Sequence, residues 1–502
     1  MTDAPTLGAG VPTPPIALTG ETITPRIAAE RVTLSESQVA TLRTLCPDMV
    51  TDRAVLADAG RDWWPLAMTW AEAGQVGGIA SVLCRPTGEA EVAAVARFCN
   101  AERIPLTVSG GRSGVVGGSV PVHGGVQLDL TSMHGIVAID DRSLTVTVRA
   151  GTFGDHFEHA LRTAYGLTAG HWPQSMALAT VGGWAACRGA GQLSTRYGKI
   201  EDIVSGLRVV LADGSIIETG GQPREAAGPD LTQLFIGSEG TLGIITELTL
   251  RLHPAPPAER RAAYGFDSFG AGLEACRRIL RRGATPAVLR LYDAIESDRS
   301  YHTGDTTCVL VVLDEGDATI IDATMTVVEQ ECDGATRLDD ALVEHWLARR
   351  NDVSQLEALI SGGYVVDTME VTGPWSTLDN MYDRAIAAIS AIDGVIVASA
   401  HQSHAYTDGA CLYFTFAGKP EPEDRDRFYR AIWDAGTRAV LDAGGSLSHH
   451  HGIGANRARY MHKAHGAAMM TLQVLKSALD PNGILNPAKL GFDNPFGEAP
   501  LP

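Results

Sequence analysis

Apolar and polar positions in the first half of the chain follow the order strand, helix, strand. A short strand is expected from Ser81, and Glu89 to Asn100 place their apolar residues on one face of an amphipathic helix. The apolar run from Ile104 to Val108 then predicts a buried strand, which completes a β-α-β unit. Further strands are expected over residues 125–130, 135–140 and 144–149, and a helix capped by Ser35 over residues 36–45.

The second half has strand-like apolar runs separated by helical segments, which is typical of an α+β sandwich. Helices are expected from Pro422 to Asp442 and from Arg457 to Ala478. Residues 1–34 lack a hydrophobic period and are rich in Pro, Thr, Ala and Gly, which predicts a flexible arm. The expected strands cover residues 261–266, 287–291, 307–313, 364–370, 395–400 and 410–416.

Composition and charge narrow the class of protein. A chain of 502 residues with 45% hydrophobic and 20% charged residues is long enough for two or three packed domains. The net charge of -19 disfavours nucleic acid and anionic lipid as partners. The eight cysteines are far apart, without a CxxC pair, so we expect free thiols and a cytoplasmic protein. Neither a signal peptide nor a membrane-spanning segment is expected.

A glycine-rich loop, SGGRSGVVGGSV, follows the predicted strand at residues 109–120. Glycine-dense backbone leaves N–H groups free and lets a diphosphate approach closely without a lysine. The spacing is not that of a Walker loop, and a β-rich stretch rather than a helix follows, which argues against a Rossmann fingerprint. Tight turns account for most such loops, but three further segments strengthen the interpretation: residues 179–191, 196–217 and 235–252.

Three consecutive histidines, His449, His450 and His451, stand in the small-residue stretch GGSLSHHHGIG at residues 444–454. No helix or strand there could bury all three, and imidazoles titrate near neutral pH, so this loop predicts a reaction centre. The alternative is a solvated polar loop.

The glycine-rich loop, Tyr197-Gly198 with Glu201-Asp202, GSEGTLGIIT at 237–246 and LDPNGILNP at 479–487 resemble the FAD-binding fold of the vanillyl-alcohol oxidase superfamily. Within it, the chain is most similar to the alkyldihydroxyacetonephosphate synthases, on the motifs at 62–64, 180–184, 290–291, 408–411 and the triple histidine. The resemblance implies an α+β fold: a two-subdomain PCMH-type FAD-binding domain and an antiparallel-sheet cap with flanking helices. The expected boundaries are an arm at 1–34, the FAD domain at 35–256, the cap at 257–440 and a segment returning to the flavin at 441–502.

The resemblance also implies which residues contact FAD. Many members of the superfamily bond the flavin to a histidine of the diphosphate loop, but Arg112, Ser113 and Gly114 fill that stretch here, so we expect non-covalent FAD. The expected cofactor residues are Ser109, Gly110, Gly111, Arg112, Ser113, Gly114, Thr180, Gly182, Gly183, Gly237, Glu239, Gly240, Gly243, Ile244, Ile245, Asn486 and Lys489.

Proton chemistry beside the flavin is expected from one phenol, one guanidinium and several imidazoles. The alternatives are a core tyrosine with a bonded hydroxyl, a surface ion pair for the arginine and a turn residue for the first histidine. A metal site using His401, His404 and the triple histidine is a further alternative, but we expect a hydrogen-bonded proton relay and no metal. The expected catalytic residues are Tyr413, His449, His450, His451, His171, Arg290 and His404.

Two functions follow. The first is an FAD-dependent oxidoreductase that oxidises an alcohol or 2-hydroxy acid by proton abstraction and hydride transfer. The second, implied by the resemblance, is the non-redox exchange of acyl for alkyl in ether-lipid synthesis. The synthases carry a second cap arginine where this chain has Gln355 and Leu356, although Arg349 or Arg350 could replace it by a helical shift. We therefore favour the oxidoreductase, with a small-molecule substrate. The electron acceptor and the oligomeric state, a homodimer included, stay open.

Overall fold

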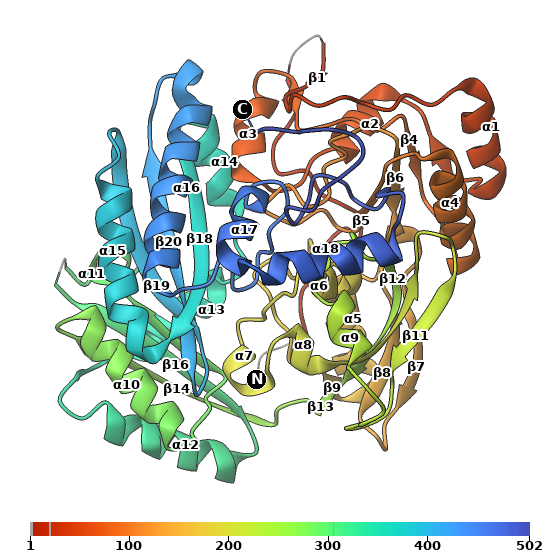
Figure 1. Ribbon diagram of the computed structural model, residues 1–502. Coiled ribbons are helices and arrows are strands. Elements are labelled where there is room, and N and C mark those ends of the chain that lie inside the picture. The colour runs from red at the N-terminus through yellow and green to blue at the C-terminus, as the bar shows by residue number, and fades with distance from the viewer. Residues whose placement is uncertain (1–3, 20–21, 305, 502) are drawn as a thin grey trace.

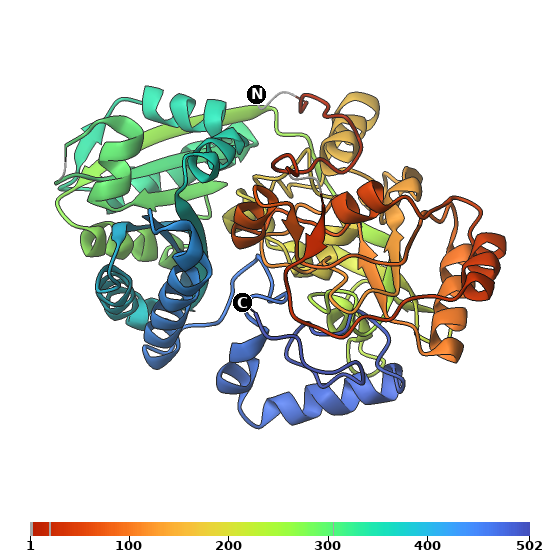
Figure 2. The same ribbon diagram turned by 90° about the horizontal axis from the view of Figure 1, so that it is seen from above.

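The computed structural model describes residues 4–19, 22–304 and 306–501, and three larger sheets organise them (Figure 1). Two sheets lie in the body, residues 36–254, and the third forms the cap, residues 258–442. Seen from above, the cap lies beside the body, and the C-terminal helices run along one side of the body (Figure 2). The Tyr197 hydroxyl donates to Glu315 at 2.8 Å and so ties body to cap.

The first sheet of the body has four strands in the order β2-β4-β6-β5. The strands β4, β6 and β5 are parallel, as the predicted β-α-β unit requires, and β2 is antiparallel to β4. The elements of this part are β2 (Met49–Val50), β4 (Val82–Cys84), β5 (Leu106–Ser109), β6 (Val126–Asp129), α1 (Glu36–Leu45), α2 (Arg53–Ala59), α3 (Pro65–Ala71) and α4 (Glu89–Glu102).

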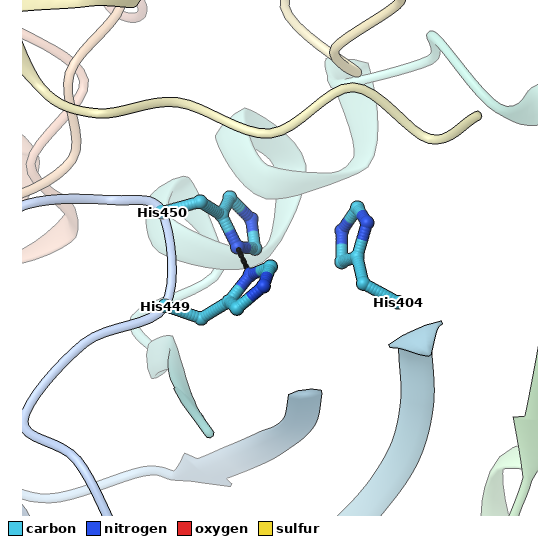
Figure 3. A group of neighbouring side chains, drawn as sticks. All are labelled: His404, His449 and His450. Carbon is cyan, nitrogen blue, oxygen red and sulfur yellow. Dashed lines mark hydrogen bonds between the residues drawn. The ribbon is translucent and has the colours of Figure 1, made fainter. Parts of the chain in front are cut away.

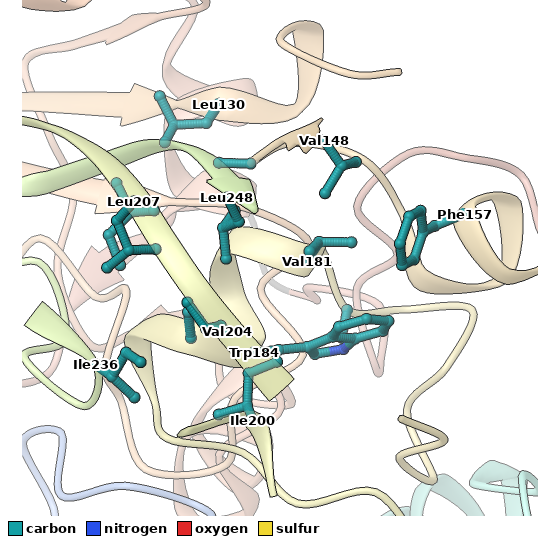
Figure 4. Packing of buried hydrophobic residues seen from close by; sticks show 14 of the residues in the cluster. Leu130, Val148, Phe157, Val181, Trp184, Ile200, Val204, Leu207, Ile236 and Leu248 are labelled. Carbon is teal, nitrogen blue, oxygen red and sulfur yellow. The ribbon is translucent and has the colours of Figure 1, made fainter. Parts of the chain in front are cut away.

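The second sheet of the body is antiparallel, in the order β11-β10-β12-β8-β7. Trp184 and Phe157 pack beneath it with ring centroids 6.3 Å apart, inside a continuous apolar core (Figure 4). Its elements are β7 (Ile136–Asp140), β8 (Thr145–Arg149), β10 (Val204–Val210), β11 (Ile216–Gly220), β12 (Ile244–Arg251), α5 (Gly154–Ala160), a π-helical turn (Leu161–Tyr165), α6 (Val181–Ala186), α7 (Ser194–Tyr197), α8 (Ile200–Ile203) and α9 (Leu231–Phe235). A separate pair joins β9 (Leu167–Thr168) to β13 (His253–Pro254).

The cap is a seven-stranded antiparallel sheet in the order β17-β14-β16-β15-β19-β20-β18. Leu412, Phe414 and Phe416 of β20 are fully buried in the cap core, so the alternate residues of that strand face the other way. The elements are β14 (Ala258–Phe266), β15 (Val288–Tyr292), β16 (Cys308–Gly316), β17 (Thr336–Leu338), β18 (Val365–Pro374), β19 (Val395–Ala405), β20 (Gly409–Gly418), α10 (Phe269–Arg281), α11 (Ala294–Tyr301), α12 (Ala318–Glu331), α13 (Ala341–Arg349), α14 (Ser354–Ser361), α15 (Leu378–Ser390) and α16 (Arg425–Asp442).

Every strand predicted for the cap is present, and β17 was not predicted. The prediction of one helix from Arg457 to Ala478 is wrong. This stretch contains two separate helices, α17 (Met461–His465) and α18 (Ala468–Leu479). Gly466, with φ 52° and ψ −128°, adopts a conformation that side-chain-bearing residues rarely reach, and it interrupts the helix there. The segment after α18 returns to the first sheet, where Leu485 pairs in parallel with Leu106 of β5.

The described part of the expected flexible arm is packed against the rest of the chain. β1 (Thr24–Pro25) pairs with β3 (Gln75–Val76), and the neighbouring Arg26 forms an ion pair with Asp426 of α16. Ile27 is only 1% exposed because it lies in the cap core cluster. These contacts offset the conformational entropy that the chain loses when it is ordered, so this part of the arm is packed and not flexible as its composition predicted.

All eight cysteines are free thiols. Within the described ranges, no helix combines the length and the apolar character needed to cross a bilayer.

Candidate active site

A cavity of about 940 Å³ runs from the glycine-rich loop to the cap sheet. Its wall in the body is formed by residues 108–119, by the start of α6 and by the segment leading into β12. Its wall in the cap is formed by β15, β19 and β20, and part of the triple-histidine loop closes it. The predicted reaction centre and the predicted cofactor loop therefore line the same cavity.

The glycine-rich loop presents its backbone to this cavity. The N–H groups from Gly110 to Val116 donate to no other group within the ranges 4–19, 22–304 and 306–501. A Cβ on Gly111 would lie 1.9 Å from the carbonyl oxygen of Leu178, and one on Gly110 would lie 2.3 Å from Oγ1 of Thr180. The loop therefore keeps unpaired amides along the cavity wall, and at Gly110 and Gly111 only glycine fits. A run of free amides is the donor set that a diphosphate such as that of FAD requires.

The back of this loop is held by residues from the C-terminal segment. Asn486 donates from Nδ2 to the carbonyl oxygens of Gly118, at 2.9 Å, and Glu239, at 2.7 Å. Lys489 donates from Nζ to the carbonyl oxygen of Val120 at 3.0 Å, and burial lowers its pKa to about 8. Neither side chain lines the cavity, so their contribution is to fix the loop rather than to contact a ligand.

Most of the predicted cofactor residues line the cavity. The exceptions are Asn486, Lys489 and Gly237, whose N–H donates to the carbonyl of Ala185 at 2.9 Å. Those that line it are Ser109, Gly110, Gly111, Arg112, Ser113, Gly114, Thr180, Gly182, Gly183, Glu239, Gly240, Gly243, Ile244 and Ile245.

The triple-histidine loop is wrapped around a buried carboxylate, Glu370 of β18. Oε1 of Glu370 accepts from the backbone N–H groups of His449, His450 and His451, at 3.2, 3.0 and 2.8 Å. Arg457 forms an ion pair with the same carboxylate, and both side chains have 0% exposure. Burial alone would raise the pKa of Glu370, but Arg457 and His451 hold it well below its usual value. The loop therefore has an anionic centre.

One branch from this carboxylate leads to Tyr413. Nδ1 of His451 lies 3.2 Å from Oε2 of Glu370, and the Tyr413 hydroxyl lies 3.4 Å from Nε2 of His451. The carboxylate favours a proton on Nδ1, so Nε2 is the acceptor for the phenol. Burial raises the pKa of Tyr413, and its hydroxyl accepts from Thr368 at 3.1 Å. We call this set Glu370, Arg457, His451 and Tyr413 the anchored network.

A second set of hydrogen bonds carries no carboxylate. His450 and His449 meet through their Nδ1 atoms at 2.8 Å (Figure 3), and Nε2 of His449 lies 3.0 Å from the Tyr406 hydroxyl. That hydroxyl lies 3.2 Å from Oγ of Ser194, which lies 2.7 Å from Nδ1 of His404. We call this set His450, His449, Tyr406, Ser194 and His404 the neutral network.

Burial lowers the pKa of His404, His449 and His450 well below the usual value, so these rings are neutral at pH 7. Ligand atoms of the three lie within 4.8 Å of one another, a spacing that a metal ion could use. Both nitrogens of His449 are already engaged in hydrogen bonds, which leaves that ring without a free lone pair. The geometry therefore favours hydrogen bonding over metal ligation.

Arg290 is held by a buried histidine and not by a surface ion pair. Nδ1 of His401 lies 2.7 Å from Glu296, so Nε2 accepts from Nη2 of Arg290 at 2.5 Å. Burial and the neighbouring Arg290 lower the pKa of His401 to about 4. The Arg290 guanidinium therefore keeps its charge at the cavity wall, in a fixed orientation.

His171 lines the cavity without a partner among the described residues. Its ring is 1% exposed, packs on Trp184 at 4.6 Å, and has no hydrogen bond at either nitrogen. Burial lowers its pKa to about 3. An unpaired buried imidazole is costly, and both ring nitrogens of His171 are available for a polar atom in the cavity.

Of the predicted catalytic residues, His449 alone does not line the cavity. Sequence reasoning missed Glu370, Arg457, Ser194 and Tyr406, which hold the histidines. Only Glu370 gave a sequence signal, because it is a charged residue within a predicted apolar strand.

Two domain families match the chain. Residues 80–220 match the FAD binding domain family, and residues 255–490 match the C-terminal domain of FAD linked oxidases.

Relatives that match across most of the chain include oxidoreductases and a synthase. An uncharacterised FAD-linked oxidoreductase, YgcU, of Escherichia coli O157:H7 is 35% identical over 417 residues, covering 79% of this chain and 86% of its own. The glycolate oxidase subunit GlcD of Bacillus subtilis is 30% identical and covers 81% of this chain and 87% of its own. An alkyldihydroxyacetonephosphate synthase of Dictyostelium discoideum is 29% identical and covers 83% of this chain and 74% of its own.

A solved structure of an alkyldihydroxyacetonephosphate synthase superposes with a TM-score of 0.78 at 25% identity, covering 96% of this chain and 90% of that one. Together with the antiparallel cap sheet, this similarity confirms the predicted α+β fold of a PCMH-type FAD domain and a cap.

Proposed function

This chain belongs to the FAD-linked oxidases, and on that basis we propose that it oxidises a hydroxyl-bearing carbon of an alcohol or 2-hydroxy acid. FAD is its cofactor, and when bound it supplies the acceptor for a hydride. The diphosphate of FAD would lie against the free amides of residues 110–116. The diphosphate loop has Arg112 and Ser113 where a covalent histidine would be needed, so we propose that the cofactor is held without a bond from this loop.

The observation that carries the proposal is the line of contacts from Glu370 through His451 to Tyr413. A tyrosine with a raised pKa cannot act as a base alone, but it can take a substrate proton while its own proton passes to an imidazole. The carboxylate then stabilises the imidazolium that forms. In this role Tyr413 accepts the hydroxyl proton of the substrate, and His451 holds the proton that Tyr413 gives up.

The substrate would be oriented by charge and by an unpaired imidazole. Arg290 is fixed by His401 at the cavity wall and fits a carboxylate or a developing alkoxide. His171 offers two unpaired nitrogens for a polar substrate or cofactor atom. The similarity to a glycolate oxidase subunit supports a 2-hydroxy acid, in which a carboxylate adjoins the reacting carbon.

The second candidate is the exchange of acyl for alkyl on a dihydroxyacetone phosphate. The similarity to the synthases supports it, because the chain covers most of a solved synthase structure. The cap positions Gln355 and Leu356, which line the cavity, carry no charge for a phosphate. Arg349 and Arg350 also line it, and the Arg350 guanidinium is stacked over Trp172 at 4.5 Å, where burial lowers its pKa to about 10. These contacts favour the oxidoreductase.

An anaerobic bleaching screen tests the proposal. The FAD-loaded protein is mixed with short alcohols, glycolate and D- and L-lactate, and the flavin absorbance is followed. Loss of the visible absorbance with one class of substrate is expected. A flavin that stays oxidised throughout, together with acyl-for-alkyl exchange on an acyl-dihydroxyacetone phosphate, would establish the synthase instead.

A further inference from the structure

The neutral network connects two cavity-lining imidazoles behind the cavity wall. His450 and His404 line the cavity, whereas His449, Tyr406 and Ser194 do not. Each contact between them is 2.7–3.2 Å, so the chain of hydrogen bonds is continuous from His450 to His404. A continuous chain of groups that both donate and accept is what proton transfer needs.

Two members of the network are half-buried, His450 and Tyr406, whereas His404, Ser194 and His449 are buried. His450 lines the cavity, but Tyr406 does not, and it precedes the exposed residues Thr407 and Asp408 in the turn between β19 and β20. The Tyr406 backbone is held there, because the Trp375 indole donates to its carbonyl at 2.9 Å. Tyr406 is therefore the half-buried member of the network that lies outside the cavity wall.

The positions of the protons on the ring nitrogens of His450 and His449 allow transfer from the cavity toward Tyr406. If Nδ1 of His450 donates to Nδ1 of His449, then Nε2 of His449 donates to the Tyr406 hydroxyl. Nε2 of His450, which has no hydrogen bond within the described residues, is then a lone pair on a cavity-lining ring. Neutral imidazoles pass protons by exchanging tautomers and need not become charged for long.

We propose that the Tyr406 hydroxyl, reached through His450 and His449, carries protons between the cavity and solvent. This inference rests on the proposed function, in which each oxidation leaves one hydroxyl proton on the Tyr413–His451 pair. The His451 and His450 rings pack edge to face with their centroids 4.5 Å apart, so the proton held by His451 lies beside the first ring of the neutral network. The proton enters at Nε2 of His450, one proton leaves His449 for the Tyr406 oxygen, and the phenol releases its own to water. Tyr406 is a positioning and relay residue, since it does not touch the substrate.

The test compares flavin and proton signals in Tyr406→Phe. The FAD-loaded protein, weakly buffered with a pH-indicator dye, is reduced by the substrate that bleaches it in the screen. In the wild type the proton signal should follow the bleaching in one phase. In Tyr406→Phe the bleaching should persist, and proton release should form a separate phase slower by about tenfold or more. Added imidazole buffer should restore a single phase, which it would not do if the substitution had only disturbed the packing.

Reduction by electrochemically reduced methyl viologen keeps this test separate from the proposed function. It delivers electrons without protons and needs no substrate, and two-electron reduction of a flavin draws a proton into the cavity, so proton uptake should show the same slow phase. If no substrate bleaches the flavin but reduced viologen gives the slow phase, the oxidation fails and the relay stands. His449→Gln, which lacks a second ring nitrogen to hand a proton on, should behave alike, and Tyr382→Phe, which loses a cap phenol outside the cavity, is the control. A single phase in both Tyr406→Phe and His449→Gln would overturn the relay.

Discussion

The anchored network and the neutral network leave the same histidine loop, yet they differ in charge and in where they end. The anchored network closes on Glu370 and Arg457, which are both fully buried. The neutral network contains only imidazoles and hydroxyls, runs from His450 to His404, and passes through the half-buried phenol of Tyr406. The comparison teaches that one carboxylate can fix a loop and stabilise charge on one side, while the other side consists only of groups that can both donate and accept a proton.

The largest expected effect comes from breaking the anchored network at its centre. Glu370→Gln keeps the shape of the side chain but leaves Arg457 buried without a counter-charge. We expect the free energy of unfolding to fall by about 3–5 kcal/mol, the usual cost of removing one partner of a buried pair. Chemical denaturation measures it, with Glu344→Gln, an exposed partner of Arg261, as the control. Equal losses in the two variants would show that Glu370 does not anchor the loop.

The next effect concerns turnover and not stability. Tyr413→Phe removes the hydroxyl at the end of the anchored network and should slow turnover by more than ~100-fold while FAD stays bound. Steady-state rates measure the loss of turnover, and the flavin spectrum of the purified variant shows whether FAD is still bound. Full activity would remove Tyr413 from the mechanism.

The pH dependence of stability should separate the networks. A buried histidine with a lowered pKa stays neutral while the unfolded chain takes up a proton, so its contribution is complete above pH 6.5 and is lost as the pH falls below it. Each such ring costs up to about 1.4 kcal/mol per pH unit. The contribution of Glu370, whose pKa is depressed, persists down to about pH 4.5 and is lost below it.

We therefore expect the free energy of unfolding to fall steeply between pH 6.5 and 5.5, and His404→Gln to make that fall shallower. Denaturation series at pH 7.5, 6.5 and 5.5 measure both slopes. A wild-type stability that does not change over this range would contradict the neutral state of these rings.

The smallest effect is expected from the side branch of the neutral network. Ser194→Ala removes the hydroxyl between His404 and Tyr406 and should cost about 1 kcal/mol of stability, the net worth of a hydrogen bond. Because the route from His450 to Tyr406 remains, turnover should fall less than in Tyr406→Phe. A larger fall than in Tyr406→Phe would place the proton route through His404.

The sequence predicted the cap sheet well, because it depends on local patterns, and the cofactor role of the glycine-rich loop stays a prediction. Glycine spacing at residues 109–120 and apolar runs in the cap are visible within a few residues. Residues Ser194 and Tyr406 gave no such signal, since each acquires its role from a partner tens to hundreds of residues away. The sequence predicted Arg457 only as the start of a helix, whereas in the structure it forms an ion pair with Glu370 of β18.

The pairing of Leu485 with β5 and the hold of Asn486 on Gly118 and Glu239 have a consequence for biosynthesis. The diphosphate loop is translated more than 350 residues before the segment that braces it. On a ribosome the nascent chain would therefore complete both body sheets while its nucleotide pocket still lacked a rear support. A nonsense codon after α18 would spare nearly all of the fold and yet release a polypeptide with poor flavin retention.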